Sequence, residues 1–158
     1  MNRFCEQPTN DISPTGNNRL TLVGFHIITK EFKEFRLNLW DIGGQKTIRE
    51  FWRNYFEETD GVVWVVDSSD RRRMEDCRNE LHKLLKEEQM IGASLLVMAN
   101  KQDIPSCLTK SEIYDILNLE SMKTHNRRIF ECSAITGENV EGGFEWLVSE
   151  ISNRIFFK

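Results

Sequence analysis

The sequence contains few histidines and prolines, and its cysteines are scattered. Its 158 residues include three histidines, three prolines and four cysteines. No two histidines stand at ligand spacing, which argues against metal catalysis by histidine. No cysteines form a C-x-x-C pair, which favours structural thiols over a disulfide framework. With 39% hydrophobic residues and so little proline, the chain is not of the low-complexity or disordered class.

Long apolar runs and an excess of positive charge are also lacking. No run approaches the roughly 20 residues of a transmembrane helix. The N-terminus carries neither a signal peptide nor a Met-Gly myristoylation site. Lys and Arg number 21 against 25 Asp and Glu, a net charge of −4 that argues against nucleic-acid binding. We therefore expect one cytoplasmic domain without a lipid anchor.

Several short segments have the composition of β-strands. The residues from Leu20 to Phe32 and from Phe35 to Trp40 predict a two-strand hairpin with one wetter face. Gly61 to Val66 and Leu95 to Ala99 are apolar throughout, which is typical of strands buried on both faces of a parallel sheet. Arg128 to Cys132 is a weaker candidate. Residues 1 to 19 predict no element.

Between these segments the apolar spacing lengthens to about 3.6 residues, the period of an amphipathic helix. A capping box, Thr109-x-x-Glu112, precedes one of the three helical stripes. The stripes consist of Met74, Cys77, Leu81, Leu84 and Leu85; of Ile113, Ile116 and Leu117; and of Val140, Phe144, Leu147, Val148, Ile151 and Ile155. Alternating strands and helices predict an α/β fold with helices on both faces of a mostly parallel sheet.

Small or polar residues follow each predicted strand. These segments are Asp41 to Gln45, Asp67-Ser68, Asn100 to Asp103 and Ser133-Ala134. In an open parallel sheet the carboxyl ends of the strands share one edge, and ligands bind there. We therefore expect the four segments to converge on one site.

The segment Asn100-Lys101-Gln102-Asp103 has the chemistry to recognise guanine. A carboxylate at Asp103 can accept hydrogen bonds from both N1–H and the 2-amino group of guanine, and adenine offers no such pair of donors. Asn100 can join neighbouring loops and contact N7, while the Lys101 stem can lie along the face of the base.

The segment from Asp41 to Gln45 has chemistry suited to a terminal phosphate. Asp41 offers a carboxylate to a water on Mg²⁺, Gly44 a backbone N–H to the phosphate, and Gln45 an amide to orient an attacking water. Each motif is weak alone. The two in this order, each ending a hydrophobic strand, form a strong signal.

The segments WDIGGQ, WRNYF, NKQD and CSAITGEN resemble small GTPases of the Arf and Arf-like family. The resemblance covers about residues 24 to 158 and implies a three-layer, P-loop NTPase-like fold. It divides the chain into a divergent N-terminal segment with a partial switch I, residues 1–23, and an incomplete Arf-like GTPase domain, residues 24–158. It also implies a GTPase that binds GTP or GDP with Mg²⁺.

Residue by residue, the resemblance implies a role for each matched position. Asn100, Lys101 and Asp103 bind guanine, Ala134 donates its backbone N–H to the base carbonyl, and Ser133 braces that loop. Gly44 senses the terminal phosphate and Gln45 orients the catalytic water. Thr15 and Asp41 serve magnesium, Thr15 directly and Asp41 through water. Phe25, Trp40 and Tyr55 form an aromatic triad for effectors, for which core packing is the alternative.

One motif of the family is missing from this sequence. The phosphate-binding pattern G-x-x-x-x-G-K-[ST] occurs nowhere in the 158 residues. We expect the first strand, the phosphate loop and the first helix to be lacking, which leaves two unpaired strand edges between the hairpin and Val62 to Val66. A truncated gene model or retained intron, a short isoform, and a divergent pseudo-GTPase remain open as explanations.

Two functions follow from these observations. The first is a monomeric guanine-nucleotide switch, with nucleotide binding weakened in this chain, that recruits effectors such as tubulin-folding cofactor D and carriers of lipidated proteins. It would act in the cytoplasm, near microtubules or centrosomes. The alternative is a nucleotide-free pseudo-GTPase that serves as a binding module.

Overall fold

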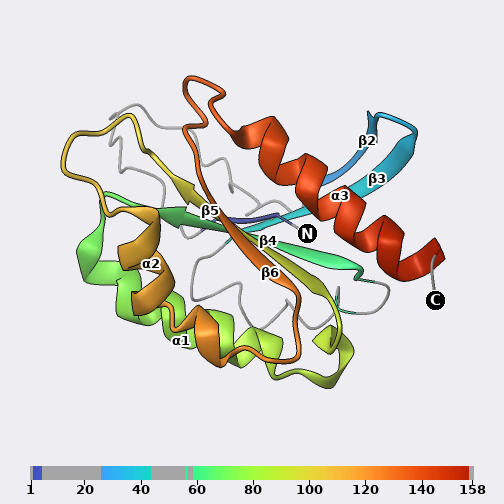
Figure 1. Ribbon diagram of the computed structural model, residues 1–158, viewed down its shortest axis with the longest axis horizontal. Coiled ribbons are helices and arrows are strands. Elements are labelled where there is room, and N and C mark those ends of the chain that lie inside the picture. The colour runs from blue at the N-terminus through green and yellow to red at the C-terminus, as the bar shows by residue number, and fades with distance from the viewer. Residues whose placement is uncertain (1, 5–25, 44–55, 57–58, 157–158) are drawn as a thin grey trace, which may run out of the picture.

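A six-stranded sheet organises the structure, a computed structural model that describes residues 2–4, 26–43, 56 and 59–156 (Figure 1). The strand order is β2-β3-β1-β4-β5-β6. β2 pairs antiparallel with β3, and the other described pairings are parallel. The strands are β1 (Asn2–Phe4), β2 (His26–Phe32), β3 (Phe35–Gly43), β4 (Gly61–Asp67), β5 (Ser94–Asn100) and β6 (Arg127–Glu131).

Helices cover both faces of the sheet. They are α1 (Met74–Leu85), α2 (Lys110–Ile116) and α3 (Val140–Phe156), with the short 3-10 helices η2 (Arg71–Arg73), η3 (Glu88–Met90) and η4 (Leu119–Ser121). Figure 1 shows α1 and α2 together on one side and α3 on the other. None of the described helices is long and apolar enough to span a membrane. The predicted fold class is confirmed.

The β4 strand shows why the apolar runs do not alternate. Val62, Trp64 and Val66 belong to the core cluster on the α1 and α2 side, whereas Val63 and Val65 belong to the cluster beneath α3. Successive side chains of a strand point to opposite faces, so a strand covered on both faces must be apolar throughout. The predicted strands at 61–66 and 95–99 are therefore confirmed as central strands.

The β1 strand lies in the position that the sequence analysis expected to be empty. Asn2 to Phe4 pair with Asp41 to Gly43 of β3 on one side and with Val63 to Val65 of β4 on the other. The expectation of two unpaired edges is therefore wrong over these residues, because three residues from the N-terminus supply a central strand. A groove of about 420 Å³ lies between β3 and α3, beside the start of β4.

The α2 helix begins as its sequence predicts. Thr109 Oγ1 accepts a hydrogen bond from the backbone N–H of Glu112 at 3.3 Å, and Glu112 Oε2 accepts one from the backbone N–H of Thr109 at 2.9 Å. Both arms of the capping box are therefore present. Arg71 of η2 donates to the other carboxylate oxygen of Glu112 at 3.2 Å, which joins the start of α2 to η2.

A buried histidine makes stability depend on pH. His125 is 4% exposed, its Nε2–H donates to the Met90 carbonyl at 2.9 Å, and its Nδ1 lies 2.9 Å from the Thr124 hydroxyl. Burial, assisted by the charge of Arg127, lowers the pKa of His125 below its usual 6.5, although the bond to Met90 opposes the shift. The unfolded chain therefore takes up this proton more readily than the folded chain does.

We expect the free energy of unfolding to be unaffected by His125 above about pH 6.5 and to fall below it, by up to about 1.4 kcal/mol per pH unit. Urea unfolding between pH 7.5 and 5 measures this slope. His125→Gln keeps a side-chain N–H donor but cannot titrate, so its slope should be shallower than that of the wild type. Equal slopes for the two proteins would contradict the role of His125.

Candidate functional site

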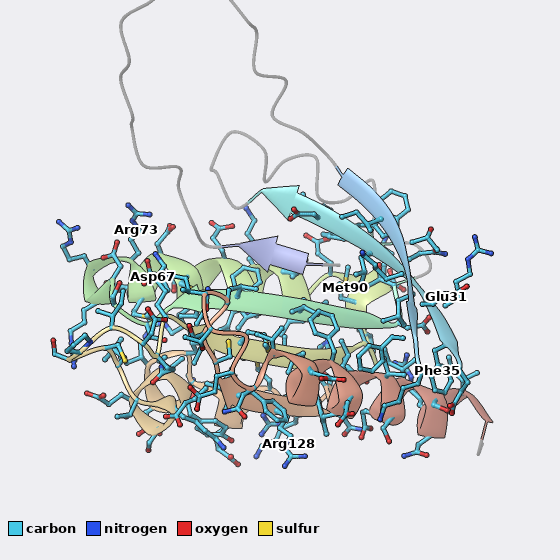
Figure 2. The ribbon with its side chains drawn as sticks, turned by 90° about the horizontal axis from the view of Figure 1, so that it is seen from above. Glu31, Phe35, Asp67, Arg73, Met90 and Arg128 are labelled. Carbon is cyan, nitrogen blue, oxygen red and sulfur yellow. The ribbon has the colours of Figure 1, made fainter. Side chains whose placement is uncertain are left out.

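The carboxyl ends of β4, β5 and β6 meet at one edge of the sheet, as predicted. The backbone N–H of Ser68 donates to the Asn100 carbonyl at 3.0 Å, that of Cys132 to the Ala99 carbonyl at 3.0 Å, and that of Gln102 to the Cys132 carbonyl at 3.1 Å. Figure 2 shows Asp67 at this end of the sheet and the hairpin residues Glu31 and Phe35 at the other. The loops after β4, β5 and β6 therefore form one site.

Asn100 joins two of these loops. It is 6% exposed, and its Oδ1 accepts a hydrogen bond from the backbone N–H of Ala134 at 2.9 Å. This confirms the predicted contact between neighbouring loops. It also means that the Ala134 N–H, which the resemblance assigns to the base carbonyl, already donates to a side chain. A guanine carbonyl would have to share this donor or displace the amide.

The Asp103 carboxylate is held in place by Ser133. Ser133 is buried, and its hydroxyl donates to Asp103 Oδ1 at 2.6 Å while its oxygen accepts from the backbone N–H of Thr136 at 3.3 Å. Asp103 itself is exposed. One carboxylate oxygen is thus fixed and the group still faces solvent, so it can accept from the ring N1–H and the 2-amino group of guanine. The bracing role predicted for Ser133 agrees with this geometry.

Lys101 adopts an unusual backbone conformation. Its φ of 71° lies in the left-handed region, where a residue with a side chain is strained. Its ammonium group lies 2.9 Å from Asp67 Oδ2 at the end of β4. The stem is therefore stretched across the site between β5 and β4, where a base could stack on it.

Asp67 is an ionised anchor that the sequence analysis did not single out for a role. Burial works against its charge, but hydrogen bonds from Ser69 and Lys101 outweigh burial and keep the pKa of Asp67 below its usual value. Its Oδ1 accepts from the Ser69 hydroxyl at 2.6 Å and from the Ser69 backbone N–H at 2.9 Å. Asp67 and Lys101 are 34 positions apart, so no motif spacing could have revealed the pair.

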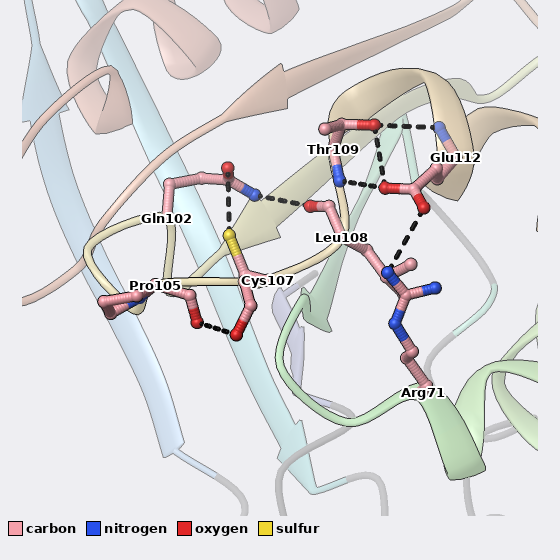
Figure 3. A network of polar contacts seen from close by, with 8 residues as sticks. Arg71, Gln102, Pro105, Cys107, Leu108, Thr109 and Glu112 are labelled. Atoms are coloured by element: carbon pink, nitrogen blue, oxygen red, sulfur yellow. Dashed lines mark hydrogen bonds and ion pairs between the residues drawn. The ribbon is translucent and has the colours of Figure 1, made fainter.

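Gln102 is a second residue that the motif left unassigned. Its Nε2 donates to the Ser68 hydroxyl at 3.0 Å. The same Nε2 donates to the Leu108 carbonyl at 3.1 Å, and the Cys107 thiol donates to Oε1 at 3.4 Å (Figure 3). These bonds close the loop that carries Asp103 against the end of β4. Gln102, the x position of the Asn-Lys-x-Asp motif, therefore holds the loop in its conformation through hydrogen bonds on its inner side.

The thiol behind Asn100 is inert. Cys132 is 3% exposed, its Sγ lies 4.0 Å from Asn100 Oδ1, and burial raises its pKa to about 11. Among the residues that the structure describes, Cys77, Cys107 and Cys132 are free of disulfides. The prediction of structural thiols holds for these three.

The remaining predicted residues divide into two groups. Thr15, Phe25, Gly44, Gln45 and Tyr55 lie outside the described residues. Trp40 and Asp41 lie in β3: Trp40 is half-buried and packs against the core on the α1 side, and Asp41 pairs in register with Asn2.

The packing of Trp40 agrees with the core alternative for this member of the triad. The carboxylate of Asp41 suits a hard cation such as Mg²⁺. Within residues 2–4, 26–43, 56 and 59–156, no three His, Cys, Asp or Glu side chains cluster closely enough to hold a metal by themselves.

The strands and helices have the arrangement of a small GTPase. Residues 2–151 match the ADP-ribosylation factor family. The chain therefore belongs to the ADP-ribosylation factor family. The match begins at residue 2, well before the residue 24 at which the sequence resemblance begins.

Curated relatives and one solved structure support this assignment. The chain is 56% identical over 151 residues to ADP-ribosylation factor-like protein 2 of Arabidopsis thaliana, covering 95% of this chain and 78% of the relative. It is 50% identical to the protein of that name from Dictyostelium discoideum, covering 99% and 81%. The fold matches the Arl6 BBS3 small GTPase from Trypanosoma brucei with bound nucleotide analogue GppNp, with a TM-score of 0.77, 31% identity, and coverage of 93% and 86%.

Proposed function

We propose that this chain is a guanine-selective member of the ADP-ribosylation factor family whose base-binding loops are preformed. The observation that carries the proposal is the 2.6 Å bond from the Ser133 hydroxyl to Asp103, which orients an exposed carboxylate before any ligand arrives. The family supports the general role of a GTP-binding switch. The proposal adds that base recognition in this chain does not depend on a phosphate loop.

Each described residue of the site has a role in this proposal. Asp103 accepts from the two donors of guanine, Asn100 holds the loops at the distance the base requires, and Lys101 offers its stem to the ring face. Asp41 would hold a water on Mg²⁺. Bound GTP would supply the terminal phosphate that distinguishes the two states of a switch.

A competition experiment tests the selectivity. We expect GDP at millimolar concentration to displace a labelled guanine nucleotide and ADP to displace it far less, because adenine presents no donor pair to Asp103. Saturation-transfer NMR with 1H detection suits such weak binding. Equal displacement by GDP and ADP would contradict the guanine assignment.

A nucleotide-free binding module is the second candidate. It is favoured by the absence of G-x-x-x-x-G-K-[ST] from the sequence. Its proposed effectors are those implied by the resemblance of this chain to ADP-ribosylation factor-like protein 2. In this form the chain would bind tubulin-folding cofactor D or carriers of lipidated proteins in the cytoplasm, near microtubules or centrosomes.

The aromatic triad provides the test of this second candidate. If Phe25 and Tyr55 contact effectors, replacing both with alanine should abolish capture of cofactor D in a pulldown, with or without added nucleotide. Trp40→Phe is the control, because Trp40 packs against the core and an aromatic ring there preserves the packing. Capture that survives the double substitution would place these aromatics in the core rather than at an interface.

A further inference from the structure

A groove lined by positive charge lies on the outer face of α1. Its lining residues come from the middle and the end of that helix, from the residue that follows it and from the turn after α2, and its volume is about 440 Å³. They are Arg78, Asn79, His82, Lys83, Lys86 and Asn118. Three are permanent cations, two are amides, and no carboxylate is among them. Since the whole chain has a net charge of −4, this concentration of cations is local.

The opposite face of α1 explains why these residues point outward. Met74, Cys77, Leu81, Leu84 and Leu85 are buried against the sheet. A helix with that apolar stripe presents its polar residues to solvent. Asn79, Lys83 and Lys86 follow one another at spacings of four and three, so they form a single row along the groove.

The wall of the groove is fixed by His82. Its Nε2–H donates to the carbonyl of Leu117 at 2.8 Å, which ties α1 to the end of α2. Asn118, the next residue, has a left-handed φ of 49° that turns the chain at the rim of the groove. Figure 1 shows α1 and α2 next to one another on this side of the sheet. The groove is therefore a preformed feature of the α1–α2 contact.

The cations of this groove have fewer ion pairs with carboxylates than the arginines at the start of the helix have. Arg71 is paired with Glu112 at 3.2 Å and Arg73 with Asp70 at 3.0 Å. Among the described residues, neither Lys83 nor Lys86 has a carboxylate within 4.0 Å, and Arg78 reaches Glu75 only at 3.5 Å on the surface. The positive charges of Lys83 and Lys86 are thus left unneutralised by the neighbouring carboxylates, whereas Arg78 forms a surface ion pair with Glu75.

We propose that this groove binds an acidic segment of a partner protein. Carboxylates spaced along such a segment meet Arg78, Lys83 and Lys86, and the amides of Asn79 and Asn118 supply further donors. The site is separate from the edge where Asp67 lies. The α1 helix begins beside that edge and Lys86 follows its last residue, about 18 Å further along at 1.5 Å per residue.

Fluorescence anisotropy with a labelled deca-glutamate peptide tests the proposal on the full chain. We expect saturable binding at low salt that weakens steeply between about 50 and 300 mM salt, since exposed charge pairs are screened. The combined change Lys83→Glu and Lys86→Glu should weaken it at least about tenfold.

A variant with the same net charge is the control. Lys30→Glu with Lys110→Glu changes the total charge equally but lies outside the groove, and both lysines are exposed. It should bind within about twofold of the wild type. If both variants lost the same affinity for the peptide, overall charge alone would explain the binding, and the proposal would be overturned.

Two further probes separate the chemistry of the partner. Phosphatidylserine vesicles and inositol hexakisphosphate should compete less well than deca-glutamate at equal charge. Stronger binding to either of them, lost in the Lys83 and Lys86 variant, would assign the groove to phosphate-bearing ligands instead and overturn the acidic-segment proposal.

Discussion

Titration of micromolar Mg²⁺-GTP into the 158-residue chain should give no measurable heat of binding and no GTPase turnover above the blank. The base-binding loops are present, but the motif that holds phosphates in the family is absent from the sequence. Each of its bonds to a charged phosphate oxygen is worth roughly 1.5 to 3 kcal/mol. Four such bonds amount to about 6 to 12 kcal/mol, or some four to nine decades of affinity.

A graft gives this prediction its control. Replacing β1 with the first strand, the phosphate loop and the first helix of a relative should restore tight binding and turnover, because the base pocket needs no rebuilding. The result should be insensitive to Cys132→Ser, since that thiol is buried and neutral. Tight magnesium-dependent binding by the unmodified chain would show that residues of this chain already hold the phosphates.

The sequence predicts those parts of the fold that local patterns encode. Apolar runs without alternation locate β4 and β5, because both faces of these strands are buried. The capping box fixes the start of α2 within one residue. The β1 strand could not be found in this way. Three residues carry no periodicity, and their place between β3 and β4 is set by pairing with two segments that follow 39 and 61 positions later.

The candidate site divides in the same way. The residue types that recognise guanine can be predicted, since Asp103 and Asn100 belong to a local motif. Their orientation cannot, because it depends on partners from another loop: Ser133 for Asp103 and Ala134 for Asn100. The ion pair of Lys101 with Asp67 likewise joins two strands that the sequence separates. The residue types of the site can thus be predicted from local motifs, but their orientation can be determined only from the folded structure.

Changing Asp103 to asparagine should change which base the site prefers. The carboxylate accepts two hydrogen bonds from guanine, and an asparagine amide at this position presents a donor where one acceptor stood. The variant loses one hydrogen bond to a charged group and places the asparagine NH₂ against the 2-amino group of guanine, which is also a donor. Binding of guanine should therefore weaken by about 3 kcal/mol, or about a hundredfold in affinity. Xanthine carries a carbonyl in place of the 2-amino group, so it gains the bond that guanine loses. Competition between GDP and XDP, in the grafted chain or at millimolar nucleotide, measures the change.

Two control variants separate base selection from loop damage. Ser133→Ala removes the hydroxyl that orients Asp103, so it should weaken GDP and XDP binding by similar factors and leave guanine preferred. Asp115→Asn removes an exposed carboxylate on α2 and should change neither affinity. If Asp103→Asn weakened both nucleotides equally, as Ser133→Ala should, Asp103 would be a support of the loop and not the residue that reads the base. A reversed preference confined to Asp103→Asn can arise only from direct contact between that side chain and the base.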